Sequence, residues 1–139
     1  MEKVVLASNN AGKLQEFRSI LAGVLDIIAL QDLGLKADPE ETGQSFEENA
    51  RIKAEYTCRI SGLPALADDS GLEVDALGGA PGIYSARYAP GSDADRVEKL
   101  LRDMNGELQR RARFVSVVAL VWPDGRAVTA RGTCEGRIT

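Results

Sequence analysis

The sequence contains no histidine, and this absence removes several large classes of enzyme chemistry. Without an imidazole, a Ser-His or Cys-His nucleophile pair and a histidine-ligated metal are all excluded for the isolated chain. Any chemistry must therefore use carboxylates, lysines, hydroxyls, thiols or a metal ion that is held by oxygen atoms.

Cysteine and long apolar runs are also scarce. The two cysteines, Cys58 and Cys134, lack a CxxC spacing and have no plausible zinc partners, so no zinc site is predicted. No stretch approaches the ~20 apolar residues that are needed to cross a bilayer, and the N-terminus carries no signal-peptide cleavage pattern. These features are typical of a reduced, cytoplasmic protein.

Basic residues are outnumbered by acidic ones, 17 against 21, which gives a net charge of −4. An acidic protein is poorly suited to binding nucleic acid or an anionic membrane surface, although one pocket can still be locally basic. The 139 residues, 44% of them hydrophobic, are enough for one globular domain with a buried core. We therefore predict a single domain over residues 1–139 that binds neither nucleic acid nor membrane.

Short apolar runs alternate with helical patterns along the chain. Strands are predicted over residues 4–7, 24–30, 72–77, 114–122 and 127–134, with a further apolar run at 65–67. Helices are predicted from Lys13, over 45–60 with a capping-box pattern at its start, and over 92–104. This alternation predicts an α/β protein, and the hairpin at the end of the chain makes its central sheet mixed.

The first candidate site is the turn at residues 8–13, Ser-Asn-Asn-Ala-Gly-Lys, between a strand and a helix. Backbone N–H groups at a helix N-terminus, with a lysine nearby, form an anion site that phosphate commonly occupies. The turn differs from a P-loop, because the first glycine of that motif would fall at Ala7 and its hydroxyl residue at Leu14. The alternative is a solvent-exposed turn whose Asn and Gly serve only backbone geometry.

Two acidic segments are candidates for a catalytic or metal site. Residues 68–71, Asp-Asp-Ser-Gly, end an apolar run, and open α/β sheets bind ligands at the carboxyl ends of their strands. The loop 38–43 offers carboxylates, and Mg²⁺ commonly takes one or two carboxylates together with substrate phosphates. The alternatives are a polar turn and a solvated acidic surface, and a pairing of Glu40 with Asp69 would favour the metal site.

Asn49 and Lys53 lie four residues apart on one face of the helix predicted over 45–60. This spacing describes either an exposed polar stripe or a face that brings Lys53 near a polyphosphate. The loop 78–88, rich in glycine, is predicted to be a packed structural loop, with Arg87 as an alternative phosphate or partner contact.

Together these segments resemble the inosine triphosphate pyrophosphatase family, house-cleaning enzymes that act on non-standard purine nucleoside triphosphates. The resemblance rests on residues 4–13, 40–50, 67–72 and 77–88, which occur in the same order. It implies an ITPase-like (Maf/Ham1-like) α/β fold, with a mixed central sheet flanked by helices, and a homodimer. It also implies hydrolysis of ITP, dITP or XTP to the monophosphate and pyrophosphate, by Mg²⁺-assisted attack of water at the α-phosphorus.

The resemblance also implies roles for individual residues. The triphosphate is expected to lie in the turn formed by Ser8, Asn9, Asn10, Ala11, Gly12 and Lys13. Glu40 and Asp69 are expected to hold Mg²⁺, and Asp69 is expected to activate the attacking water as well. Ser70 and Lys53 are expected to contact the substrate. Carboxylates that are ionised at pH 7 and a metal ion would together do without histidine.

The family continues beyond the strand that ends near residue 139. It adds a Gly-Phe-Gly-Tyr-Asp segment, a later lysine and a Ser-His-Arg segment that recognises the base, and none of these is present here. We therefore expect residues 1–139 to be the N-terminal portion of the family fold, C-terminally incomplete, with the phosphate and metal half of the site. The alternatives are a P-loop-like NTPase and a non-catalytic nucleotide-binding module.

Overall fold

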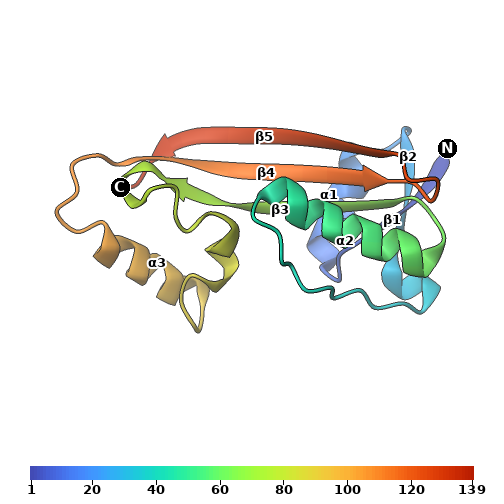
Figure 1. Cartoon of the computed structure of the whole chain (residues 1–139), viewed down its shortest axis with the longest axis horizontal. Helices are drawn as coiled ribbons and strands as arrows, with labels where there is room; N and C mark the ends of the chain where they lie inside the picture. The colour runs from blue at the N-terminus through green and yellow to red at the C-terminus, as the bar shows by residue number, and fades with distance from the viewer. The chain divides into compact units, whose positions relative to one another are not determined.

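A five-stranded mixed sheet with the strand order β2-β1-β3-β4-β5 is the frame of the fold (Figure 1). Strand β1 (Glu2–Leu6) pairs in parallel with both β2 (Leu25–Ala29) and β3 (Ala65–Val74). Strands β4 (Arg111–Val121) and β5 (Ala127–Arg137) form the predicted hairpin, and their arrows point in opposite directions in Figure 1. The predicted α/β class with a mixed sheet is therefore confirmed.

The computed structural model describes residues 1–139, which form two compact units. The first unit comprises Met1–Asp69 and Val117–Ala130, and the second comprises Ser70–Ser116 and Arg131–Thr139. Strands β3, β4 and β5 each contribute residues to both units. A single domain over the whole chain stays a prediction.

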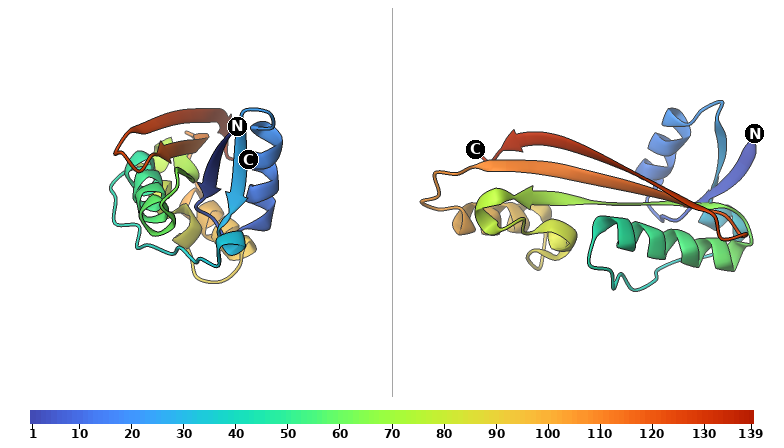
Figure 2. Two further views of the ribbon diagram at one scale, coloured as in Figure 1. Left: turned by 90° about the vertical axis from the view of Figure 1, so that its right-hand side faces the viewer. Right: turned by 45° about the horizontal axis from the view of Figure 1, so that its top comes forward.

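In the first unit helices cover both faces of the sheet. Successive side chains of a strand point to opposite faces, so both faces carry apolar side chains that need to be buried. Val4 and Leu6 of β1 form a core with Leu14 and Phe17 of helix α1 (Ala11–Ile20). Helix α2 (Phe46–Ser61) buries a stripe consisting of Phe46, Asn49, Ala50, Ala54, Thr57 and Cys58. Figure 2 shows the strands of this unit lying between α1 and α2. The two helices therefore approach the sheet from opposite sides.

The helix ends follow the predicted capping signals. Ser45 caps α2 by accepting a hydrogen bond from the Glu48 N–H, and Gly62 ends the helix in the left-handed conformation. The Glu48 carboxylate accepts from the Gln44 N–H and not from the Ser45 N–H, so only the Ser45 half of the predicted capping box is formed. None of the helices combines the length and apolar character that a membrane-spanning segment requires.

The second unit contains helix α3 (Asp93–Asp103) and the 3₁₀ turns η2 (Asp75–Leu77) and η3 (Gly82–Arg87); a further 3₁₀ turn, η1 (Leu30–Leu33), lies in the first unit. The core of the second unit is formed by Val74, Met104 and Ala112. The Ser85 hydroxyl accepts from the Leu72 N–H at 2.9 Å and donates to the Gly82 carbonyl at 2.7 Å. This hydroxyl fastens the loop 78–88 to β3.

The structure corrects one prediction about the backbone. A polar turn was one alternative for residues 68–71, ahead of a separate strand over 72–77, but β3 continues through them without interruption from Ala65 to Val74. An extended backbone sends successive side chains to opposite faces of the sheet. Asp68 and Asp69 therefore point to opposite faces of β3.

Candidate functional site

The turn between β1 and α1 is held by its own side chains. The Asn10 Oδ1 accepts hydrogen bonds from the N–H groups of Gly12 at 2.8 Å and Lys13 at 3.2 Å, while the Ser8 hydroxyl accepts from the Asn10 N–H at 3.1 Å. Two of the N–H groups that were expected to face an anion are thus already satisfied. The donors still available for an anion include the Ser8 hydroxyl, the Asn10 amide and the Lys13 ammonium.

A small cavity of about 90 Å³ opens beside this turn. It is lined by Ser8, Asn9, Asn10, Ala11 and Leu14 from the turn and by Ala29, Leu30 and Gln31 from the end of β2. The cavity therefore lies at the carboxyl ends of β1 and β2, which are neighbouring parallel strands. This is the edge at which open α/β sheets bind their ligands.

The two adjacent aspartates of β3 take different partners. On the α1 side, the Asp68 Oδ2 forms an ion pair with the Lys13 Nζ at 2.8 Å. On the α2 side, Asp69 lies in the electrostatic field of Lys53 and Glu41. The strand thus places one carboxylate beside the turn 8–13 and the other beside the acidic loop.

Asp69 is the most strongly perturbed acid of the first unit. Burial raises its pKa from 3.8 to about 6; Lys53 and a hydrogen bond from the Asn49 side chain lower it, and the charges of Glu41 and Asp68 raise it further. Its Oδ2 is buried and has no hydrogen-bond partner. A buried carboxylate oxygen without a donor is costly, and it is the kind of atom that a cation would satisfy.

The acidic loop approaches Asp69 through Glu41. The Lys53 Nζ lies 3.3 Å from the Glu41 Oε1, and the Glu41 charge acts on Asp69. Glu40, the residue that the sequence singled out, is exposed and has no such contact in the structure. The assignment of Glu40 as a metal ligand stays a prediction.

Asn49 links the acidic loop to the site, and its burial excludes one of the two alternatives for this helix face, an exposed polar stripe. Only 1% of Asn49 is exposed, and its Oδ1 accepts a hydrogen bond from the Gly43 N–H at 2.8 Å. The sequence contained a signal for this burial, because Asn49 lies between the core residues Phe46 and Ala50 on α2. One buried amide therefore contacts the acidic loop as well as Asp69.

The contact at Gly43 gives a testable prediction. A Cβ at this position would lie 2.6 Å from the Asn49 Oδ1 and 2.7 Å from the Glu48 Cβ, so the loop must move away from α2. We expect Gly43→Ala to lower the free energy of unfolding by about 1–3 kcal/mol in urea denaturation. The matched control is Gly132→Ala, where a Cβ meets nothing within 4 Å. Equal stability of both variants would contradict the close contact.

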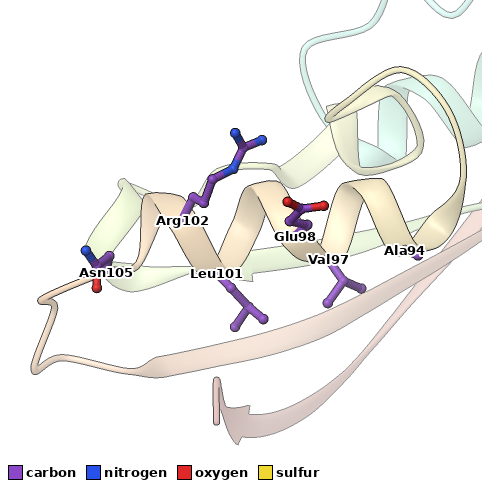
Figure 3. A pocket seen from close by; sticks show the side chains of 6 residues that line it. All are labelled: Ala94, Val97, Glu98, Leu101, Arg102 and Asn105. Atoms are coloured by element: carbon purple, nitrogen blue, oxygen red, sulfur yellow. The ribbon is translucent and has the colours of Figure 1, made fainter.

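The remaining features lie in the second unit. Ser70 follows Asp69 in β3 and is exposed, which leaves its hydroxyl accessible. A larger open groove of about 730 Å³ runs along α3, and Figure 3 shows its lining: Ala94, Val97, Glu98, Leu101, Arg102 and Asn105. The groove is mainly apolar and holds one carboxylate and one guanidinium, so it lacks the lysines and paired acids of the first unit. The candidate site is therefore the smaller, polar one.

Comparison with known proteins decides the family. The model of the Ham1 family matches residues 4–139. The chain belongs to the Ham1 family. This match confirms the family resemblance and the ITPase-like (Ham1-like) architecture that the sequence motifs predicted.

Individual relatives and solved structures support the same family assignment. The dITP/XTP pyrophosphatase of Symbiobacterium thermophilum is 53% identical over 99% of this chain and 70% of its own length. That of Pseudomonas aeruginosa is 52% identical over 99% of this chain and 72% of its own length. The solved Ham1 protein of Staphylococcus aureus superposes with a TM-score of 0.91 at 43% identity, covering 99% of this chain and 72% of that one.

Family membership indicates a requirement for a divalent metal ion. The Ham1-family chain has no cluster of three or more acidic or cysteine side chains that could hold a metal by itself. The unpartnered Asp69 Oδ2, with the charge of Glu41 acting on the same carboxylate, nevertheless fits a hard cation. Two carboxylates completed by ligands from a substrate are a sufficient donor set.

Proposed function

We propose that this chain hydrolyses the non-standard purine nucleoside triphosphates dITP, ITP and XTP to the nucleoside monophosphate and pyrophosphate. Relatives that are named dITP/XTP pyrophosphatases, and are about half identical over nearly the whole chain, support this proposal. The structural observation that carries it is Asp69, whose buried oxygen lacks a partner and whose neighbours are Lys53 and the acidic loop.

The proposed roles follow from the donors and acceptors at each position. Ser8, Asn10 and Lys13 offer a hydroxyl, an amide and an ammonium to phosphate oxygens. Lys53 offers a second ammonium once a phosphate replaces Glu41 as its partner. Ser70, next to Asp69 and exposed, is proposed to contact the substrate.

Asp69 is proposed as the group that accepts a proton from the attacking water. In the metal-free protein its pKa of about 6 leaves it mainly ionised at pH 7 and makes it a stronger base than an ordinary aspartate. Asp69 and a carboxylate of the acidic loop, Glu40 or Glu41, would hold Mg²⁺. When bound, Mg²⁺ supplies charge neutralisation at the phosphates and lowers the pKa of water.

We further propose, on the family resemblance, a cytoplasmic homodimer whose ligand is a purine nucleoside triphosphate. The net charge of −4 supports a protein that associates with neither nucleic acid nor anionic membrane surfaces.

The products distinguish the proposed function from its alternatives. We expect dITP and Mg²⁺ to yield dIMP and pyrophosphate, because water attacks the α-phosphorus and the bond from that phosphorus to the oxygen bridging it to the β-phosphorus breaks. The measurement is ³¹P NMR with anion-exchange separation of the nucleotides, and dGTP serves as the control substrate. Release of dIDP and orthophosphate would favour a P-loop-like NTPase, and tight dITP binding without turnover would favour a binding module. Either result contradicts the proposal.

Metal binding is expected to stabilise the protein through Asp69. A ligand that binds only the folded state at about 100 times its Kd adds about 2.7 kcal/mol, so saturating Mg²⁺ should raise the thermal midpoint. The shift should vanish in Asp69→Asn. Glu40→Gln and Glu41→Gln, measured in parallel, identify the second carboxylate as the one whose loss reduces the shift. An unchanged shift in Asp69→Asn would contradict its role as a metal ligand.

A further inference from the structure

We propose that Asp68 is a positioning residue for the reaction: its carboxylate holds the Lys13 ammonium in place for a phosphate group of the substrate. This inference rests on the proposed function and deepens it, because no role has so far been given to Asp68. Asp68 differs from Asp69 in that it contacts the substrate only through Lys13.

The geometry joins two elements that are distant in the sequence. Lys13 lies in the first turn of α1, Asp68 lies in β3, and the Nζ–Oδ2 distance is 2.8 Å. The Asp68 side chain is 11% exposed, whereas that of Lys13 is 37% exposed. The carboxylate is therefore the fixed partner, anchored in the sheet, and the lysine reaches it from the side that is open to solvent.

Such an anchor is useful because a lysine side chain is flexible. Its four-carbon stem has several rotatable bonds, and a substrate would otherwise have to offset the rotamer entropy that is lost when it orders the ammonium. An ammonium has three N–H donors, and the Asp68 Oδ2 is the one side-chain partner that this structure gives it. Two donors thus remain for phosphate oxygens while the third keeps the nitrogen in place.

The charge of Asp68 would oppose triphosphate binding if it acted alone. A carboxylate beside an anion site repels the anion, and only the ion pair with Lys13 cancels this repulsion. Removing the Asp68 charge leaves the positive charge of Lys13 uncancelled, and its stronger attraction for the triphosphate offsets the lost order of the lysine, so ground-state binding should stay nearly unchanged. The reaction rate should fall, because a misplaced ammonium stabilises the transition state less well.

The first test asks whether Asp68 orders Lys13, and it needs no enzyme activity. Lysines are reductively methylated for short times, and the rate at Lys13 is measured by mass spectrometry against the exposed Lys36. We expect Asp68→Asn to speed methylation of Lys13 about threefold to tenfold, in line with the loss of a charge-assisted hydrogen bond. The matched control is Glu55→Gln, which breaks the exposed 2.7 Å ion pair with Arg51 on α2 and should change nothing.

The second test is a kinetic double-mutant cycle with dITP. We expect Asp68→Asn to lower kcat about tenfold to hundredfold while KM changes by less than about threefold. The double variant Asp68→Asn/Lys13→Ala should be no slower than Lys13→Ala alone, because Asp68 acts only through that lysine. Glu55→Gln again provides the control.

The outcomes separate this inference from the proposed function. If the wild type releases no pyrophosphate, the proposed function fails, and the methylation rates still decide whether Asp68 holds Lys13. Equal methylation of Lys13 in wild type and Asp68→Asn overturns the inference. It is also overturned if the two substitutions are additive in kcat, or if Asp68→Asn lowers only the thermal midpoint, since a merely structural link between α1 and β3 would behave in this way.

Discussion

Replacing Asp69 by asparagine is expected to lower the rate of pyrophosphate release from dITP by about a thousandfold, the range in which loss of a general base falls. Asparagine has nearly the same shape, but its amide neither accepts a proton nor offers the carboxylate oxygen that lacks a partner in the structure. The initial rate with saturating Mg²⁺, measured by a coupled pyrophosphate assay, is the test.

Two substitutions serve as controls for this loss. Asp26→Asn changes an exposed aspartate on β2, away from the acidic loop, and is expected to retain the wild-type rate. Asp68→Asn changes the neighbouring residue of β3 and is expected to lose less than Asp69→Asn. A rate for Asp69→Asn within about tenfold of the wild type is too small a loss for a general base and would contradict that role.

The architecture could largely be predicted from local patterns. Ser45 and Gly62 delimit α2 as their capping preferences predict, and the Pro-Asp-Gly sequence at 123–125 forms the predicted hairpin. Both signals act within a few residues of the chain, so the sequence alone contains them. The family relationship could also be inferred from the sequence, because it rests on the order of short motifs.

The alternative of a polar turn at residues 68–71 was wrong. Asp, Ser and Gly favour turns as isolated residues, yet β3, which lies between β1 and β4 in the sheet, stays extended through all four. The consequence for the site is substantial, because only an extended backbone places Asp68 and Asp69 on opposite faces. A turn would have left both aspartates free to face the same ligand.

Long-range details of the site could not be predicted. Which of Glu40 and Glu41 approaches Asp69 depends on how the loop is tied to α2, and that tie is the hydrogen bond from the Gly43 N–H to Asn49. The partner of Lys13 likewise lies 55 residues away in the sequence, at Asp68. Such contacts arise from tertiary packing, and no local spacing encodes them.

The energetic state of Asp69 leads to the last prediction: in the metal-free protein, Asp69→Asn should be more stable than the wild type at pH 7.5. The pKa of Asp69 is about 6 in the folded protein and near its ordinary value of 3.8 when unfolded. Folding therefore favours the protonated form. The protonated Asp69 carboxyl therefore adds to the free energy of unfolding, and this contribution is fully present below about pH 4 and is lost as the pH rises through about 6.

At about 1.4 kcal/mol for each pKa unit this shift corresponds to at most about 3 kcal/mol, and solvent screening of the half-buried side chain reduces the loss of the wild type at pH 7.5 to about 1–2 kcal/mol. Asparagine does not titrate and escapes the loss, so the variant should gain that amount over the wild type at pH 7.5 and little at pH 4. Urea denaturation with EDTA at several pH values is the measurement.

Asp68→Asn is the matched control for this effect, because it removes a neighbouring carboxylate that has a cation beside it. It should be less stable than the wild type at pH 7.5 by about 1 kcal/mol, since its ion pair with the partly exposed Lys13 is lost. A wild type that is as stable as Asp69→Asn at pH 7.5 would contradict the raised pKa.

The opposite signs expected for two adjacent aspartates follow from their opposite faces: Asp68 has a lysine within 2.8 Å, whereas the Asp69 Oδ2 is buried without a partner. In the first case the carboxylate stabilises the fold, and in the second the fold carries a cost that a bound cation would relieve.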